Sequence, residues 1–275
     1  MWTVNAKDAR IPALGFGTFT LPPDDCHRMV KAALREGYRH VDTAQIYENE
    51  EAVGTGIRDS GIGRDDLWVT TKVWVSNFRD GDLQRSVDES LRKLALDHVD
   101  LLLLHWPNPD VDLAETLSAL AAVKQAGKTR HVGISNFTVD LLRRAVELSP
   151  EPLVTNQVEY HPLLNQDPVL EACRAQGMAL TAYSPVAQGK VLGEPVLQRI
   201  AEAHGKTPAQ VALRWLVQQE GVCAIPRSRS EDHAKANLEI FDFELSDDDM
   251  RDITGLRRPD GRQISPDGLA PQWDT

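Results

Sequence analysis

The sequence of 275 residues has few cysteines, and they form no recognisable site. Cys26, Cys173 and Cys223 are odd in number, and none stands at the spacing of a metal-binding motif. We therefore expect three buried thiols in a reducing compartment. A single His-x-Asp pair, formed by His40 and Asp42, lacks a second pair of histidines, so we expect no metal ion.

Long hydrophobic runs and an excess of positive charge are also missing. The most apolar segment, residues 99–104, has the length of a strand and is too short to cross a membrane. Residues 1–5 show neither the basic nor the apolar part of a signal peptide. The 30 lysines and arginines stand against 41 aspartates and glutamates, a net charge of −11, which would repel nucleic acids and anionic membranes. We expect a monomeric cytoplasmic protein whose partner is a small molecule.

A dinucleotide-binding glycine fingerprint is absent as well. Gly15-x-Gly17 and Gly54-x-Gly56 both lack the third glycine of Gly-x-Gly-x-x-Gly, which disfavours a doubly wound open sheet. The chain instead alternates short apolar strands with amphipathic helices, with one strand roughly every thirty residues. The expected strands cover residues 14–19, 37–43, 67–73, 99–105, 130–135, 154–160, 178–184 and 221–226.

Eight strand–helix units in a chain of this length are typical of a closed (β/α)8 TIM barrel, an α/β fold. Two short apolar pieces within residues 2–11 flank a turn and predict an N-terminal hairpin. Two helices are expected between the last two strands and two more after the eighth strand, so two helices are extra. No stretch resembles a linker, and we expect a single barrel domain over residues 1–275.

Polar side chains stand where three neighbouring strands end. Asp42 ends the second strand, Lys72 the third and His105 the fourth, and Tyr47 follows Asp42 in a loop. The carboxyl ends of barrel strands meet at one rim, so these side chains are expected to lie together. Lys72 interrupts an apolar strand and needs a partner, for which Asp42 is the obvious candidate. Those two residues alone are equally consistent with a structural ion pair.

Tyr47 and His105 favour a catalytic interpretation of the rim. A phenol has a pKa near 10. An ammonium group beside it is expected to lower that pKa, so that Tyr47 would donate a proton nearer neutral pH. His105 would hydrogen-bond a substrate oxygen and orient it. Together the four side chains suggest a proton donor placed beside a substrate oxygen.

Several motifs carry a resemblance to a known family. The chain resembles the aldo-keto reductases along nearly its whole length, and its tail at residues 264–273 is similar to the bacterial 2,5-diketo-D-gluconate reductase B type within that family. The matching motifs are GYRHVDTAQIYENE at 37–50, TKVW at 71–74, DLLLLHWP at 100–107, GISNF at 133–137 and NQVE at 156–159.

The resemblance implies a reaction and a role for each rim residue. The family's catalytic tetrad falls on Asp42, Tyr47, Lys72 and His105. Tyr47 would be the general acid, tuned by Lys72 and Asp42, and His105 would orient the carbonyl. The implied activity is NADPH-dependent reduction of aldehydes and ketones, such as small dicarbonyls or keto-sugar acids, to alcohols.

The resemblance also implies where NADPH binds. Contacts to the nicotinamide carboxamide fall on Ser135, Asn136 and Gln157, and Tyr183 would stack on the ring. Thr18 and the segment Ser184, Pro185 and Val186 complete this part of the cofactor site. The adenosine 2′-phosphate would meet Arg227, Ser228, His233 and Asn237. Arg227, His233 and Ala236 depart from the family's usual lysine, arginine and glutamate there, so the preference for NADPH is less firmly implied than the reaction.

Apolar residues just past the strand ends are candidates for the substrate pocket. These are Phe19, Ile46, Trp74 and Trp106, with His105 among them; each aromatic side chain could instead cap the barrel core. The tail at residues 262–273 is too rich in proline and glycine for a helix and could fold over the site. Two other functions are compatible with a barrel: a nucleotide-binding regulatory subunit and a metal-dependent hydrolase. The complete tetrad favours the reductase.

Overall fold

The computed structural model describes residues 2–274, and its centre is a sheet of eight parallel strands. The sheet runs in the order β10-β9-β8-β7-β6-β5-β4-β3, so strands adjacent in sequence are adjacent in space. The first and last edges also meet, because Leu14 pairs with Ala224. The Ala224 N–H donates to Ala13 O and its carbonyl accepts from Gly15 N, both at 2.8 Å. The sheet therefore closes into the expected (β/α)8 barrel.

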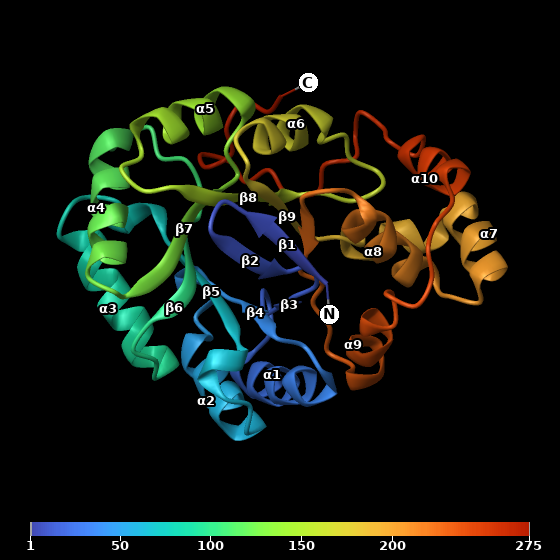
Figure 1. Cartoon of the computed structure of the whole chain (residues 1–275), viewed down its shortest axis with the longest axis horizontal. Coiled ribbons are helices and arrows are strands. Elements are labelled where there is room, and N and C mark those ends of the chain that lie inside the picture. The colour runs from blue at the N-terminus through green and yellow to red at the C-terminus, as the bar shows by residue number, and fades with distance from the viewer. Residues whose placement is uncertain (1, 275) are drawn as a thin grey trace.

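Each barrel strand is followed by a helix on the outside of the sheet (Figure 1). The strands are β3 (Phe16–Gly17), β4 (His40–Asp42), β5 (Trp68–Val73), β6 (Val99–Leu104), β7 (Thr129–Ser135), β8 (Leu153–Glu159), β9 (Ala179–Tyr183) and β10 (Val222–Ala224). Their helices are α1 (Pro23–Glu36), α2 (Glu50–Ser60), α3 (Asp82–Leu94), α4 (Leu113–Gln125), α5 (Val139–Leu148), α6 (Asp167–Ala175), α8 (Pro208–Gln218) and α9 (Glu231–Leu238). The two extra helices are α7 (Pro195–His204) and α10 (Asp247–Thr254), and short 3-10 segments are η1 (Gln45–Tyr47), η2 (Arg64–Asp66), η3 (Val75–Asn77) and η4 (Ala187–Gly193).

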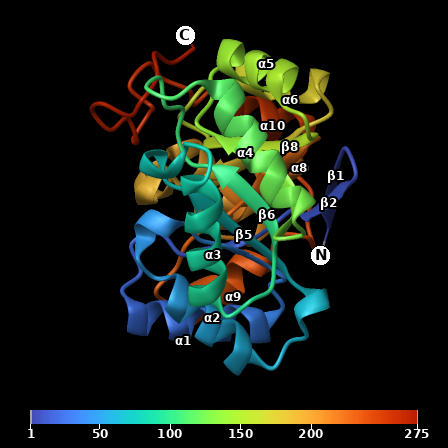
Figure 2. The ribbon, with the colours of Figure 1, turned by 90° about the vertical axis from the view of Figure 1, so that its left-hand side faces the viewer.

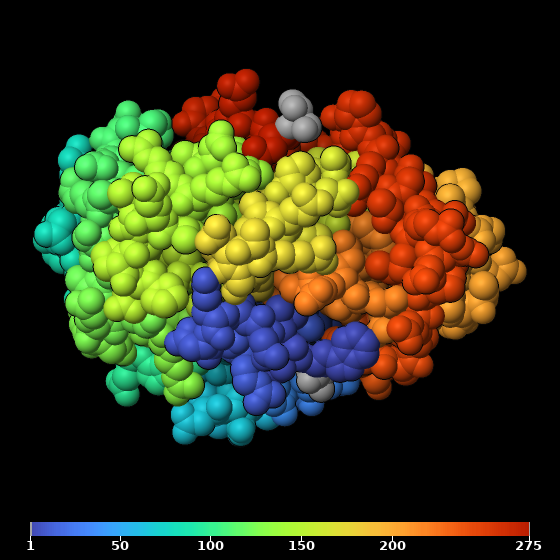
Figure 3. Space-filling model, turned by 45° about the horizontal axis from the view of Figure 1, so that its top comes forward, coloured from blue at the N-terminus to red at the C-terminus, as the bar shows by residue number. Residues whose placement is uncertain are grey.

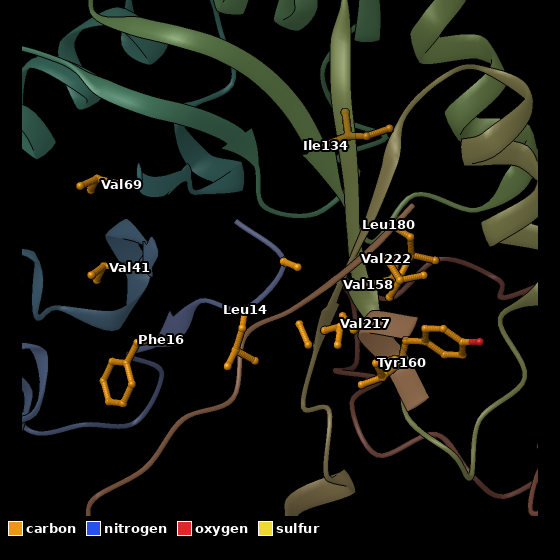
Figure 4. Close-up of a cluster of buried hydrophobic side chains, with 14 of the residues drawn as sticks. Leu14, Phe16, Val41, Val69, Ile134, Val158, Tyr160, Leu180, Val217 and Val222 are labelled. Atoms are coloured by element: carbon orange, nitrogen blue, oxygen red, sulfur yellow. The ribbon is translucent and has the colours of Figure 1, made fainter. Parts of the chain in front are cut away.

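Successive side chains along each strand point alternately into the barrel and toward the helices, so the apolar side chains form two separate cores. Leu102 of β6 belongs to the large core between the sheet and its helices, part of which is shown in Figure 4. Leu101 and Leu103 belong to a smaller cluster inside the barrel, together with Trp68 of β5. Lys72 has the same parity along β5 as Trp68, and it is fully buried. The period of two thus places a single ammonium group inside the barrel.

The N-terminal hairpin closes one end of the barrel. Its strands β1 (Thr3–Ala6) and β2 (Ala9–Pro12) pair antiparallel, and it joins the interior cluster through Ala6, Ala9 and Ile11. Figure 1 looks onto this hairpin, and Figure 2 shows it at the opposite end of the molecule from the C-terminal tail. In Figure 3 the hairpin, in blue, lies beside the yellow chain around α6, where Lys7 N donates to Gly177 O (3.2 Å). Any site at the carboxyl ends of the strands therefore lies away from the hairpin.

The first and last strands are shorter than the sequence predicted. Residues 14–19 and 221–226 were expected to be extended, whereas β3 has two residues and β10 has three. At the ends of these strands Gly17 N donates to Pro226 O and Thr18 N donates to Asp42 O, each at 3.0 Å. Pro226 has no N–H with which to donate a hydrogen bond in return to the first strand. The ladder ends early for that reason.

The composition also raised expectations about the cysteines, membrane-spanning helices and metal-binding groups. The three cysteines are buried and free, as predicted. Within residues 2–274 no helix is long and apolar enough to cross a membrane. The same residues contain no group of three or more His, Cys, Asp or Glu side chains placed to hold a metal ion.

Candidate active site

The carboxyl ends of β4, β5 and β6 bring three candidate catalytic residues to one rim. Asp42 is the last residue of β4, and Lys72 is next to last in β5. His105 directly follows β6, and its N–H continues the ladder by donating to Val73 O (3.1 Å). Tyr47 ends η1, the turn that follows β4. The structure therefore brings all four residues together, as the strand ends indicated.

The Lys72 ammonium group is the centre of this cluster. Its Nζ donates to Asp42 Oδ1 (2.5 Å), to Thr43 O (2.8 Å) and to Tyr47 Oη (3.4 Å). The Lys72 and Asp42 side chains are 1% and 2% exposed, so both charges are removed from water. Gln157 Nε2 donates to the other carboxylate oxygen, Asp42 Oδ2 (2.7 Å). Burial lowers the pKa of Lys72 even though the Asp42 carboxylate opposes that change.

The pKa of Tyr47 moves in the direction opposite to the one expected. Burial, and after it the Asp42 carboxylate, raise the pKa of Tyr47 well above its usual value. The prediction that Lys72 lowers this pKa is wrong, because a phenolate here would lose its hydration and would face the carboxylate that offsets the ammonium charge. The phenol therefore keeps its proton at neutral pH, which is the form that a proton donor requires.

His105 stands beside Tyr47 as a neutral imidazole. The two ring centroids are 5.6 Å apart, and Trp74 contacts the imidazole at 5.3 Å between centroids. Burial, and then the Lys72 charge, lower the pKa of His105 well below its usual value. A neutral imidazole carries one N–H. His105 can therefore donate a hydrogen bond to a carbonyl oxygen without adding a charge to the site.

Side-chain hydrogen bonds fix the turn that carries Tyr47. Asn49 Nδ2 donates to Thr18 O (2.9 Å), and Thr43 Oγ1 donates to Asn49 Oδ1 (3.0 Å). Gln45 Oε1 accepts from the backbone N–H that follows β5 (2.9 Å). These bonds tie η1 to the loops after β3 and β5, so the phenol is held by its neighbours on both sides. Asn49 lies in the motif at residues 37–50, but its residue type alone did not indicate that it would hold this turn.

A cavity of about 540 Å³ opens at this rim. Its polar floor includes three of the four catalytic candidates, Asp42, Tyr47 and His105. The expected substrate contacts also line it: Phe19, Ile46, Trp74 and Trp106. Phe19 and Ile46 are 53% and 44% exposed, which places them toward its mouth, whereas Trp106 is buried. Apolar walls around a few convergent polar groups are typical of a small-molecule site.

Most of the expected cofactor contacts line the same cavity. They are Thr18, Ser135, Asn136, Gln157, Tyr183, Ser184, Pro185, Val186 and Arg227. Asn136 has a φ of +64°, and it donates through Nδ2 to His105 O (3.0 Å) while its Oδ1 accepts from Tyr183 Oη (2.8 Å). One amide side chain thus links the backbone of His105 to the Tyr183 phenol.

The other three expected cofactor residues do not line the cavity. Ser228 is buried in a turn, where its Oγ donates to a backbone carbonyl two residues further on (2.8 Å). His233 is exposed in the first turn of α9, and Asn237 lies near the end of that helix. Arg227 borders the cavity, whereas Arg229 donates to a backbone carbonyl of the loop after β3 (3.1 Å). Any contact of Ser228, His233 or Asn237 with a ligand would therefore lie outside this cavity.

The sequence also matches a known protein family. The sequence model of the aldo/keto reductase family matches residues 13–258. The chain belongs to the aldo/keto reductase family. The match spans all eight barrel strands and their helices, so the family assignment covers the whole of the site described above.

Relatives of this aldo/keto reductase bear the names of carbonyl reductases. Methylglyoxal reductase DkgB of Yersinia pestis is 46% identical over 267 residues, which is 96% of this chain and 99% of that protein. A glyoxal reductase of Bacillus subtilis is 42% identical over 260 residues, 94% of each chain. A crystal structure provisionally described as a 2,5-diketo-D-gluconic acid reductase B shares 53% identity with a TM-score of 0.99, covering 100% of this chain and 98% of that one. The family and these relatives identify an oxidoreductase that acts on carbonyl compounds.

The cavity of this aldo/keto reductase also contains residues that the sequence did not assign. They are Gly17, Gln188, Ile225, Ile264, Pro266 and Leu269. Three of them belong to the tail, which confirms that residues 262–273 reach over the site. Gln188 enters from η4, where its φ is +53°. The residue types at these positions did not identify them as cavity residues, because apolar tail residues and a loop glutamine are common on any protein surface.

Proposed function

We propose that this aldo/keto reductase reduces aldehydes and ketones to alcohols with NADPH, and that small dicarbonyls or keto-sugar acids are its candidate substrates. The observation that carries the proposal is the position of the Tyr47 phenol. Its Oη lies 3.4 Å from Lys72 Nζ and borders the cavity beside His105. The relatives named for methylglyoxal and glyoxal support a small carbonyl substrate.

The polar groups on one wall of the cavity fit a nicotinamide carboxamide. Gln157 uses Nε2 to hold Asp42, and among residues 2–274 no partner is found for its Oε1. Ser135 and Asn136 border the same wall, where the Ser135 hydroxyl donates to Gln157 O (2.8 Å) and the Asn136 amide is bonded to His105 O and Tyr183 Oη, so both would meet a carboxamide by sharing or exchanging these partners. A carboxamide needs both donors and acceptors, and this set offers both. When bound, the nicotinamide would supply the hydride to the carbonyl carbon.

Arg227 fits the extra phosphate of NADPH. It is exposed at the cavity edge, and within residues 2–274 no carboxylate lies within 4.0 Å of its guanidinium group. A guanidinium fork without a protein partner is well suited to a phosphate. We therefore assign Arg227 to the 2′-phosphate, with Ser228, His233 and Asn237 as further candidates around it.

In this proposal the protein's own groups bind the carbonyl oxygen and protonate it. His105, neutral at physiological pH, donates its N–H to the oxygen and fixes its position beside Tyr47. Tyr47 then transfers its Oη proton, and the Lys72 ammonium stabilises the phenolate that remains. Before the transfer Asp42 balances the ammonium charge, so the resting site holds no unpaired charge inside the barrel. Phe19, Trp74 and Trp106 exclude water from this step.

Initial rates with a panel of carbonyl compounds test the proposal. The full chain is assayed by the loss of nicotinamide absorbance with NADPH and with NADH, using methylglyoxal, glyoxal and a keto-sugar acid. We expect turnover of at least one dicarbonyl, with a higher kcat/KM for NADPH. Binding of NADPH with no turnover of any carbonyl compound would contradict the proposal and favour the regulatory-subunit alternative.

A further inference from the structure

Gln45 is the one residue of η1 that does not line the active-site cavity. The other two residues of this turn, Ile46 and Tyr47, both border it. A 3-10 helix has three residues per turn, so three successive side chains project in three directions. The side chain of Gln45 contacts α3 and the loop after β5 instead. Any effect of Gln45 on a reaction in the cavity must therefore pass through its neighbours.

The Gln45 amide uses both of its ends. Its Oε1 accepts from Trp74 N (2.9 Å) and from Asn77 Nδ2 (3.2 Å), both in the chain that follows β5. Its Nε2 donates to Ser86 O (3.2 Å) and lies 3.1 Å and 3.2 Å from the hydroxyl oxygens of Ser86 and Ser90. The two serines are four residues apart in α3, so they share one face of that helix. One amide thus joins η1 to two other elements.

The partners of this amide fix both its orientation and its chemistry. A backbone N–H only donates and a backbone carbonyl only accepts, so the amide oxygen must face Trp74 N and the nitrogen must face Ser86 O. An ionised glutamate would keep the acceptor but would place a second oxygen against the Ser86 carbonyl. A methionine would supply no N–H or O–H donor and only a weak acceptor. Glutamine therefore satisfies both sides where side chains of similar length do not.

Trp74 extends the same constraint to the second polar group of the site. Its indole ring meets the His105 imidazole edge-on at 5.3 Å between centroids, and that imidazole meets the Tyr47 ring at 5.6 Å. His105 N also donates to Val73 O (3.1 Å), one residue before Trp74. Gln45 is thus bonded through its backbone to the turn that carries the phenol, and through its side chain to the residue that packs on the imidazole.

We propose that Gln45 is a positioning residue, which sets where the Tyr47 phenol stands relative to the His105 imidazole by holding η1 and Trp74 against α3. The proposal rests on the reductase function proposed above. A misplacement of about 1 Å between reacting groups can slow a reaction by about 10²-fold. Because Gln45 lies outside the cavity lining, its loss should slow the chemical step and leave cofactor binding unchanged.

Gln45→Met and Gln84→Met form a matched pair that tests this role. Gln84 lies in the first turn of α3, where its Oε1 accepts from Gly81 N (2.7 Å) and its Nε2 donates to Asp80 Oδ1 (2.8 Å), away from η1. Single turnovers are measured with enzyme in excess over NADPH and the parent's best carbonyl substrate saturating. We expect Gln45→Met to lower the rate by about tenfold or more with an unchanged Kd for NADPH, and Gln84→Met to keep the parent rate. Equal rates in the two variants would overturn the proposal.

Gln45→Glu separates the hydrogen bonds of the amide from the bulk of the side chain. A protonated carboxyl group has one O–H donor and one carbonyl acceptor, which is the pattern that Ser86 O and Trp74 N require. We expect the rate of this variant, divided by the parent rate at the same pH, to rise as pH falls from neutral toward the pKa of a glutamate side chain. The division cancels the titration of groups that both proteins share, such as Glu50. A ratio that stays constant or falls would overturn the need for a donor here.

Hydrogen exchange gives a readout that does not depend on turnover. The acceptor of the Trp74 N–H is the Gln45 side chain, so this amide hydrogen should exchange faster in Gln45→Met than in the parent or in Gln84→Met. Thermal unfolding shows whether Gln45→Met is folded; if it is not, Gln45→Glu carries the test through its pH dependence. Parental protection of the Trp74 N–H in folded Gln45→Met would overturn the proposal. Fast exchange together with failure of every carbonyl assay of the parent would instead refute the reductase function, and the positioning role with it.

Discussion

At the scale of single residues, the site is organised by one buried ammonium group. Lys72 Nζ contacts a carboxylate, a backbone carbonyl and the Tyr47 phenol, all within 3.4 Å. Burial disfavours the charged form of Lys72, the anionic form of Tyr47 and the cationic form of His105, and it is the largest cause of all three pKa shifts. The result is a protonated phenol and a neutral imidazole, side by side at the floor of the cavity.

Replacing Lys72 by methionine should destabilise the fold. The Asp42 carboxylate would remain buried and would keep Gln157 as its remaining hydrogen-bond partner. Breaking a buried ion pair from one side costs on the order of 3–5 kcal/mol in the free energy of unfolding. Urea denaturation followed by circular dichroism measures this loss, and kcat should fall as well because the phenolate loses its stabilising charge.

The double variant Lys72→Met, Asp42→Asn is the control for this prediction. It removes both charges, so most of the lost unfolding free energy should return, whereas carbonyl reduction should stay impaired. A single Lys72→Met variant that unfolds at the same urea concentration as the parent would show that the two charges are not coupled.

At the scale of elements, the segment before α9 directs its two arginine side chains to different places. Arg229 is turned toward α1 and the loop after β3, where its guanidinium lies 4.0 Å from Asp25 Oδ2 and donates to Thr20 O (3.1 Å). Arg227, two residues earlier, borders the cavity. The two arginines therefore offer a matched pair for testing which one meets the 2′-phosphate.

Arg227→Ala should raise the KM for NADPH far more than the KM for NADH. A hydrogen bond to a charged group contributes about 1.5–3 kcal/mol, so a rise of about tenfold or more is expected. The selectivity of the parent should also shrink at high salt. Arg229→Ala should change both values much less, and steady-state kinetics with both cofactors measure the difference. Equal effects of Arg227→Ala on NADPH and NADH would rule out a 2′-phosphate contact.

The first residue of α2 predicts a pH dependence of stability. Glu50 is 2% exposed; its Oε1 accepts from Thr71 Oγ1 (2.6 Å), and among the described residues its Oε2 has no partner. Burial raises the pKa of Glu50 above the ordinary value of 4.5. The folded state thus favours the protonated acid, and this contribution is complete below pH 4.5 and is lost as pH rises through the raised pKa.

Glu50→Gln should therefore be more stable than the parent at pH 8, because the amide does not ionise. The advantage should be about 1.4 kcal/mol for each pH unit that separates the folded and unfolded pKa values, and it should disappear as pH falls toward the unfolded value. Denaturation midpoints at a series of pH values measure it. A constant difference between the two proteins across pH would contradict the assignment of a buried, raised carboxyl group.

At the scale of the whole molecule, the barrel could be predicted from the spacing of apolar and polar residues in the sequence. Eight apolar segments at regular intervals predicted the strands, and the polar residues at three of their ends predicted a common rim. The period of two in β5 and β6 decides which side chains enter the barrel. Both faces of these strands are buried, so the sequence marked Lys72 as a lysine in need of a partner without showing that it points inward.

Other features depend on contacts between distant segments and could not be read from residue types. The closure of Leu14 against Ala224 joins opposite ends of the barrel sequence. The direction of the shift in the pKa of Tyr47 depends mainly on how far the folded rim removes water from the phenol. The presence of a lysine near a tyrosine in the sequence does not show this. The hydrogen bond from Gln263 N to the Glu159 carboxylate spans more than a hundred residues and left no local signal.

The most direct test of the central claim is a single-turnover measurement on Tyr47→Phe. This change keeps the ring and removes the proposed proton donor beside His105, while the Lys72–Asp42 pair remains. With enzyme in excess over NADPH and methylglyoxal saturating, we predict that the rate of cofactor oxidation falls by about 10²-fold or more, with an unchanged Kd for NADPH. A Tyr47→Phe protein that oxidises NADPH at close to the parent rate would contradict the account, because the proton would then come from another group.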